Sequence, residues 1–332
     1  MAPLPPERHT GVMAASLLEV FQTLASFDPP KTSLASAPWE DYADWAIGQG
    51  LAPLAAYNLE YRLGAKTGAP EWVRDRLLAI YQGSVNDNVM KLVNFKRAVD
   101  ELEGRQVIML SGGSFAESLY PHVAFRPVID LRLLVPRADL DPFVGYLRRA
   151  EFKAGEGEKD STLRELSDGR TTIFVHGELL KRGDEGLFAR SLPMKVYGPS
   201  LRRLDLEDAL LTHVLLMSRA GFDVPLIELV DLRELIQGAP SMGGVYSRPV
   251  DAEAVRSRAA EWKMERALWA ALGIVERLFP ETAAAVARLQ PQSLMMPTRE
   301  LLERLVIAPV AQVGRTQQFR GEDALRTLLA GG

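Results

Sequence analysis

The sequence predicts an α+β protein in which a small mixed sheet is flanked by helical regions. The N-terminal third carries an apolar repeat of helical period, and the same period returns from Asp205 onward. Between them, from about Gln106 to Tyr197, short apolar runs alternate with glycines and prolines. We therefore expect an N-terminal helical region at 1–104, an α/β core at 105–200 and a C-terminal helical region at 201–332.

Helices are expected throughout the N-terminal region. The longest runs from about Glu71 to Glu103, where Pro70 favours its start and Gly104 its end. Apolar residues recur along it at three- and four-residue intervals and form one stripe. Shorter helices are expected at 12–27, 39–48 and 54–63.

The α/β core is expected to contain both strands and helices. Gln106 to Leu110 is a short apolar run followed by Gly112 and Gly113, which suits a buried strand and a tight turn. The glycine- and charge-rich stretch at 155–169 predicts a mobile loop or a hairpin. The other expected elements are helices at 114–119 and 140–150 and strands at 127–135, 171–179 and 194–196.

In the C-terminal region, Asp205 is expected to cap a helix that ends at Gly221, and Pro225 to open another that ends at Ile236. A loop rich in glycine, serine and proline follows at 238–249. Further helices are expected at 251–263 and 265–279.

Composition excludes several classes of protein. The chain has 332 residues and no cysteine, so disulfides, thiolate zinc sites and cysteine nucleophiles are excluded, and a bound metal would be a hard cation such as Mg²⁺. A formal charge of −4 argues against bulk binding of nucleic acid. Neither a long apolar run nor a secretory signal is found, so we expect a cytoplasmic protein without a membrane partner.

The glycine turn after the first expected strand is a candidate phosphate site. Gly112 and Gly113 would let the backbone approach phosphate oxygens. Ser114 would offer its N–H and hydroxyl at the start of a helix, where the helix dipole favours an anion. A tight strand-to-helix turn without a ligand is the alternative interpretation.

Asp130 on the next expected strand supports a ligand site, because an acid on an otherwise apolar strand needs a cation, a metal or hydrogen-bond donors. Side chains two residues apart on a strand point to the same face, so Asp130 and Arg132 should share one face. The same rule groups Phe174, His176 and Glu178 on the third strand.

Three stretches of this region resemble a known family. They are Val107 to Gly113 (VIMLSGG), Leu119-Tyr120-Pro121, and Arg126 to Val135 (RPVIDLRLLV). Together they resemble the uncharacterised bacterial nucleotidyltransferase family of the polymerase-beta-like superfamily. Further matches are the strand ending at His176, the helix opening at Leu206 to His213, and the helix bearing Asp231, so the resemblance spans most of the chain.

The resemblance implies a magnesium-dependent transfer of a nucleoside monophosphate from a nucleoside triphosphate to an acceptor hydroxyl. In that chemistry, two aspartates spaced one residue apart and a third acid on a neighbouring strand hold two metal ions. The acceptor is not fixed by the family, since small molecules, proteins and nucleic acid ends all occur in the superfamily.

The sequence departs from the family pattern at the metal ligands. Asp130 matches the first aspartate, but Arg132 replaces the second and Phe174 replaces the third acid. Ser111 stands where a lysine commonly precedes the first glycine. Because Arg132 would repel a divalent cation, two-metal binding is not expected unless Glu178 replaces the lost acid. Arg132 would instead bind a phosphate directly or pair with Asp130 in a retired site.

From these residues we assign the following roles. The candidate catalytic residues are Asp130, His176 and Glu178, with Asp130 also the candidate ligand of Mg²⁺. The candidate phosphate-binding residues are Ser111, Gly112, Gly113, Ser114, Arg126 and Arg132. His213 lies among leucines on an apolar helix and is interpreted as a packing residue.

The favoured function is a nucleotidyltransferase-like protein that binds a nucleotide or another phosphorylated small molecule, with two-metal catalysis lost or altered. One alternative is an active magnesium-dependent nucleotidyltransferase acting on an unknown acceptor, and another is a non-catalytic scaffold for a partner protein. A serine hydrolase built on Ser111 or Ser114 with His176 and Asp130 is disfavoured, because the nucleophile-elbow spacing is absent.

Overall fold

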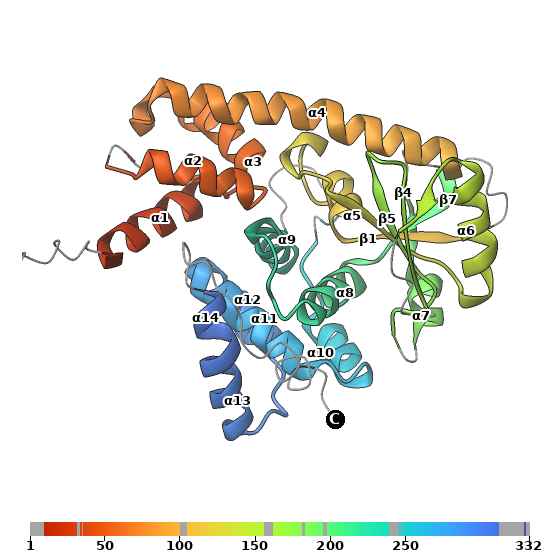
Figure 1. Cartoon of the computed structure of the whole chain (residues 1–332). Helices are drawn as coiled ribbons and strands as arrows, with labels where there is room; N and C mark the ends of the chain where they lie inside the picture. Colours follow the sequence, from red (N-terminus) through yellow and green to blue (C-terminus); the bar gives the residue numbers. More distant parts are fainter. Residues whose placement is uncertain are drawn as a thin grey trace, which may run out of the picture.

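The computed structural model of the chain describes most of its residues. The described ranges are 10–31, 34, 36–99, 105–155, 162–180, 183–194, 198–238, 246, 248–311 and 329. They form one mixed sheet with helices packed on both of its faces (Figure 1), so the α+β prediction is confirmed.

The described strands form a seven-stranded sheet in the order β3-β4-β5-β2-β1-β7-β6. The central strand β1 pairs antiparallel with β2 and parallel with β7, and β2 pairs parallel with β5. The strands are β1 (Val107–Leu110), β2 (Asp130–Leu134), β3 (Lys153–Ala154), β4 (Leu163–Ser167), β5 (Thr172–His176), β6 (Leu192–Met194) and β7 (Gly198–Arg203).

The two faces of the sheet pack against different cores. On one face, Met109, Leu131 and Val175 join a core with Phe143 of α6 (Leu140–Arg149). On the other face, Ile108, Leu110 and Leu134 join the larger helical core. By alternation, Asp130 and Arg132 belong to the second face, which looks toward the C-terminal helices.

The N-terminal helices lie over one side of the molecule. The long helix α4 begins beside α2 and α3 and runs toward α6 (Figure 1). Its Leu77 packs in the larger core and its Phe95 in the smaller one, so α4 bridges the two cores. The N-terminal elements are α1 (Thr10–Leu24), α2 (Trp39–Gly48), α3 (Ala52–Tyr57), η1 (Asn58–Leu63), η2 (Gly64–Thr67) and α4 (Glu71–Val99).

The C-terminal helices complete the larger core. Phe21 of α1 packs on Phe279 beside α11, with the ring centroids 5.2 Å apart, so the two helical regions share one core. Asp205 caps the first of these helices by accepting from the backbone N–H of Asp208. The elements are α8 (Leu206–Arg219), α9 (Leu226–Gln237), α10 (Ala252–Glu261), α11 (Glu265–Leu278), η5 (Pro280–Thr282), α12 (Ala283–Leu289), α13 (Met296–Leu302), η6 (Glu303–Ile307) and α14 (Ala308–Val310).

Short elements connect the core strands. They are α5 (Ser111–Ser118), η3 (Val123–Phe125), η4 (Arg137–Asp139) and α7 (Asp184–Arg190). None of the helices in the described ranges combines the length and apolar character needed to cross a lipid bilayer.

Of the two forms predicted for the stretch at 155–169, its described part takes the hairpin, because β4 pairs antiparallel with β5. Other predicted elements differ from the structure. Strand β7 was not predicted, and it spans the expected region boundary at residue 200. The strand expected at 194–196 is seen as β6, which ends at Met194, and residues 195–197 lie outside the described ranges. The end of the longest helix, expected at Glu103, also lies outside them.

Candidate functional site

Strand register brings Arg132 and Phe174 together. Arg132 of β2 pairs with Leu110 of β1 on one side and with Phe174 of β5 on the other. The Arg132 guanidinium carbon lies 5.9 Å from the centre of the Phe174 ring. Arg132 Nε also lies 3.2 Å from Asp130 Oδ1, so the predicted shared face of Asp130 and Arg132 is confirmed. The guanidinium therefore sits between the one candidate metal carboxylate and the phenyl ring.

Helix α5 begins directly after β1, next to this row of side chains. Ser111 starts the helix with φ +46°, a left-handed conformation that costs a residue other than glycine about 1–2 kcal/mol. The helix has no side-chain cap at its N-terminus. Its first N–H groups are therefore available to another acceptor.

The two glycines of this turn are required by close packing. A Cβ on Gly112 would lie 2.6 Å from Nη1 of Arg126, and one on Gly113 would lie 2.9 Å from Cδ2 of Leu131. Gly112 is thus in contact with a guanidinium, while Gly113 lets α5 approach the sheet. The turn is explained by packing whether or not it also binds a phosphate.

Arg126 is buried and ion-paired with helix α9. Its Nε and Nη2 donate to Asp231 Oδ2 at 3.1 and 2.9 Å, and Nη2 also donates to Glu228 Oε1 at 2.5 Å. Nη1 donates to the Pro127 carbonyl oxygen at 2.8 Å. Tyr120 donates its hydroxyl to the other oxygen of Asp231 at 2.7 Å. The segments on either side of η3 are thereby fastened to α9.

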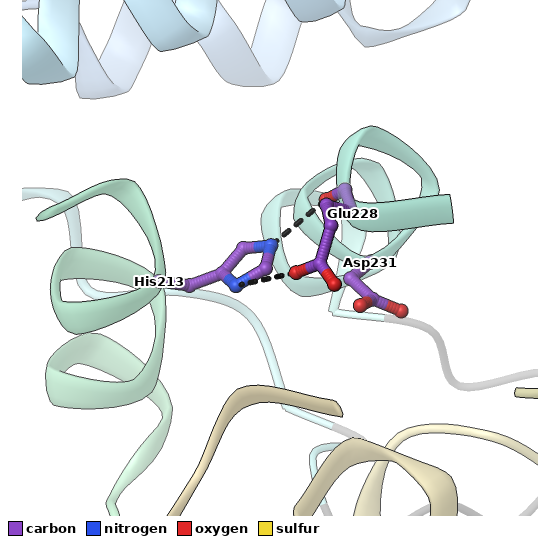
Figure 2. A group of neighbouring side chains, drawn as sticks. All are labelled: His213, Glu228 and Asp231. Atoms are coloured by element: carbon purple, nitrogen blue, oxygen red, sulfur yellow. Dashed lines mark hydrogen bonds and ion pairs between the residues drawn. The ribbon is translucent and has the colours of Figure 1, made fainter. Parts of the chain in front are cut away.

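His213 of α8 extends the same network (Figure 2). Its Nε2 lies 2.8 Å from the Glu228 carbonyl oxygen, and its Nδ1 lies 3.6 Å from Glu228 Oε2. Nδ1 also lies 3.5 Å from the Ser111 hydroxyl, and the Phe115 ring packs edge-on against the imidazole. His213 therefore packs in the core, as its apolar neighbours predict, and also links α9 to the first residue of α5.

Burial and charge have opposing effects on this network. Burial alone would lower the pKa of Arg126, but Asp231 and Glu228 raise it above its usual value. Burial alone would raise the pKa of Glu228, but Arg126 holds it below its usual value. Burial raises the pKa of Asp231, although Arg126 acts in the opposite direction. Arg126 therefore stays charged and stabilises the ionised form of Glu228.

The residues present do not fit a pair of divalent cations. Beside β2, Asp130 carries its own guanidinium partner, and Phe174 supplies no ligand atom. A second group, His213, Glu228 and Asp231, has ligand atoms within 4.8 Å of one another. There Arg126 already donates to both carboxylates, so a cation would face a buried positive charge.

The structure separates the other predicted site residues. His176 is buried on the Arg132 face but pairs with Leu134, about 7 Å further along the sheet than Arg132. Glu178 is exposed beyond the end of β5. Ser114 is buried within α5, where its carbonyl oxygen accepts from the Ser118 hydroxyl. The catalytic and phosphate-binding roles of these residues stay predictions.

Sequence reasoning missed that Tyr120, Glu228 and Asp231 form one network with Arg126. Two features of the sequence could have indicated the network. One is the pair of acids, Glu228 and Asp231, on an apolar helix, and the other is the pair of donors that precede prolines, Tyr120 and Arg126. Acids on apolar helix faces need buried donors, and this pair of donors supplies them.

The single mixed sheet with helices on both faces makes this an α+β protein, in which the glycine turn into α5 lies beside the aspartate strand β2. A family model described as "Uncharacterised nucleotidyltransferase" matches residues 35–280, about three quarters of the chain, so the chain belongs to this family. No curated protein and no solved structure matches the chain.

Replacing Gly112 with alanine tests the packing of the turn. The new Cβ would overlap the Arg126 guanidinium, which is fixed by two carboxylates and cannot move freely. We expect Gly112→Ala to lower the free energy of unfolding by about 1–3 kcal/mol in urea denaturation. Gly83→Ala, in open space on α4, is the matched control and should leave stability unchanged or raise it. Equal effects of the two substitutions would contradict the packing account.

Replacing Glu228 with glutamine tests the ion pair. The folded pKa of Glu228 lies below its ordinary value of 4.5. Its ionised form therefore stabilises the fold above that pH, and the contribution is lost as the pH falls through the folded pKa. We expect Glu228→Gln to cost about 1–3 kcal/mol at pH 7.

The cost of Glu228→Gln should shrink as unfolding is measured at pH values below 4.5. Glu253→Gln, at an exposed carboxylate on α10, is the control and should change stability by less than about 0.5 kcal/mol. A cost for Glu228→Gln that does not depend on pH would show that the charge of Glu228 is not what stabilises the fold.

Proposed function

We propose that this chain binds a nucleotide or another phosphorylated small molecule beside Arg132, and that the two-metal catalysis of its family is lost or altered. The observation that carries this proposal is the position of Arg132, between Asp130 and Phe174. By the family resemblance, these are positions where carboxylates would hold the two cations.

The charge of the site supports the loss of paired metals. Two like charges 4 Å apart repel by about 4 kcal/mol at an effective dielectric constant of 20. A cation on Asp130 would lie within that range of the guanidinium, because the two side chains are in contact. The ion pair also uses the carboxylate oxygens that a metal would need.

The surroundings of Arg132 support binding of an anion. The uncapped N-terminus of α5 follows Leu110, the residue that pairs with Arg132 across the sheet. A helix N-terminus and a guanidinium both attract a phosphate. The Arg132 side chain is 36% exposed, so a ligand can reach it. Its contacts with Asp130, at 3.2 and 3.3 Å, are long for charge-assisted hydrogen bonds and can be exchanged for phosphate contacts.

A scaffold for a partner protein is the second candidate. Helix α4 exposes large apolar side chains, including Trp72 and Met90. These residues lie five turns apart on the helix surface and face away from Leu77 and Phe95. Exposed apolar groups of this kind occur at protein interfaces.

Calorimetric titration with ATP, CTP, GTP and UTP tests the proposal. We expect binding of at least one triphosphate with the same affinity in the presence and absence of Mg²⁺, because Arg132 and α5 contact the phosphates directly. Arg132→Ala should weaken this binding about tenfold or more, since it removes a charge-assisted contact.

Arg170→Ala, at an exposed arginine in the β4–β5 turn, should leave the affinity unchanged. Binding that requires Mg²⁺ would support the active enzyme instead. Binding of none of the four triphosphates would favour the scaffold.

A further inference from the structure

A pocket of about 520 Å³ lies at the C-terminal end of α9, beyond the Arg126 network. It is bounded by the segment after α1, by α9, and by η5 and α12. Helix α9 turns Asp231 toward Arg126 and presents Glu234 and Gln237 to the pocket. The volume is in the range of pockets that hold small molecules.

Glu234 places a buried carboxylate in the wall of this pocket. The residue is 3% exposed, and its Oε1 accepts from Nε and Nη2 of Arg233. Its Oε2 makes no hydrogen bond to any residue in the described ranges and is not enclosed away from solvent. Oε2 is therefore a solvent-accessible acceptor without a partner among the described residues, on a largely buried residue that lines the pocket.

Arg233 holds this carboxylate in place. Its Nη2 also donates to the Ala25 carbonyl oxygen at 2.7 Å, and its guanidinium carbon lies 4.6 Å from the centre of the Phe279 ring. These contacts fix the guanidinium behind Glu234. Its charge offsets that of Glu234 but leaves Oε2 free to accept from a ligand.

A second carboxylate faces the same pocket from η5. Glu281 lines the wall and forms no ion pair with any residue that the structure describes. Burial raises the pKa of Glu234, Arg233 acts in the opposite direction, and the charge of Glu281 adds to the increase. The two carboxylates therefore repel each other, and a cation between them would relieve that repulsion.

We propose that this pocket binds a small molecule through a protonated primary amine, which donates to Glu234 Oε2 and lies beside Glu281. An ammonium group has three donors and no acceptor, which matches two acceptor carboxylates. Arg288 of α12 also lines the pocket, seven residues, or about two helical turns, after Glu281. A ligand that also carries a carboxylate would pair with it, so both simple amines and amino acids fit the shared chemistry.

Calorimetric titration with putrescine and, separately, with lysine tests this site in the full chain. We expect saturable binding of at least one of them at one site per chain. Glu281→Gln should weaken it several-fold and Glu234→Gln about tenfold or more, because each removes one charged acceptor. If lysine binds more tightly than putrescine and Arg288→Ala removes that preference, an amino acid is the better ligand.

Two further variants separate this site from general attraction of a cation. Ala285→Leu narrows the pocket without changing its charge and should also abolish binding. Glu300→Gln, at an exposed carboxylate of α13 outside the pocket, should leave binding unchanged. Glu281→Gln and Ala285→Leu change exposed or partly buried positions, so they remain informative if Glu234→Gln fails to fold.

The proposal would be overturned if the unsubstituted chain and all of these variants bound the probes equally weakly. It would also be overturned if neither putrescine nor lysine showed saturable binding. The pocket lining includes neither Arg132 nor any residue of α5, so the tests of this site and of the nucleotide site can fail separately.

Discussion

The buried ion pair between Arg126 and Asp231 is the interaction on which the site depends. Arg126 belongs to the segment before β2, and Asp231 to helix α9. The pair therefore joins two parts of the chain that are more than one hundred residues apart. Removing one partner of a buried pair costs about 3–5 kcal/mol, because the other charge is left without compensation. The same guanidinium packs on Gly112, so the position of α5 relative to β1 depends on it as well. In this way one arginine sets the geometry of the glycine turn, of Glu228 and of His213.

The sheet register gives a second arginine a different environment. Arg126 is enclosed and fully partnered, whereas Arg132 is partly exposed and held by Asp130 and the Phe174 ring. A buried, fully partnered arginine cannot leave its carboxylates without a large cost, whereas an exposed one beside an uncapped helix can exchange partners with a ligand. Of the two, Arg132 is therefore the better candidate for contact with a phosphate, while Arg126 organises the turn behind it.

Much of the fold could be predicted because it depends on local patterns. Helical periodicity and capping residues indicated α2, α6, α8 and α9 within a few residues, and alternation placed Asp130 and Arg132 on one face. Strand β7 was missed because Arg202 and Arg203 made it look polar, while in the structure Arg202 donates to Ser191 of the neighbouring segment. The Arg126 network could not be predicted from spacing alone, since Tyr120 and Asp231 are 111 residues apart and meet only through the packing of α9.

We propose that the Arg132 guanidinium occupies the place of a metal carboxylate, and titration of Mn²⁺ into designed variants tests this proposal most directly. Arg132→Asp combined with Phe174→Glu restores two acids beside Asp130, while Arg132→Asn with Phe174→Gln removes the same side chains without adding charge. In electron paramagnetic resonance, we expect the acidic double variant to bind Mn²⁺ and both the unsubstituted chain and the neutral double variant to bind none tightly. Two Mn²⁺ ions bound by the unsubstituted chain, or no gain in the acidic double variant, would contradict the account.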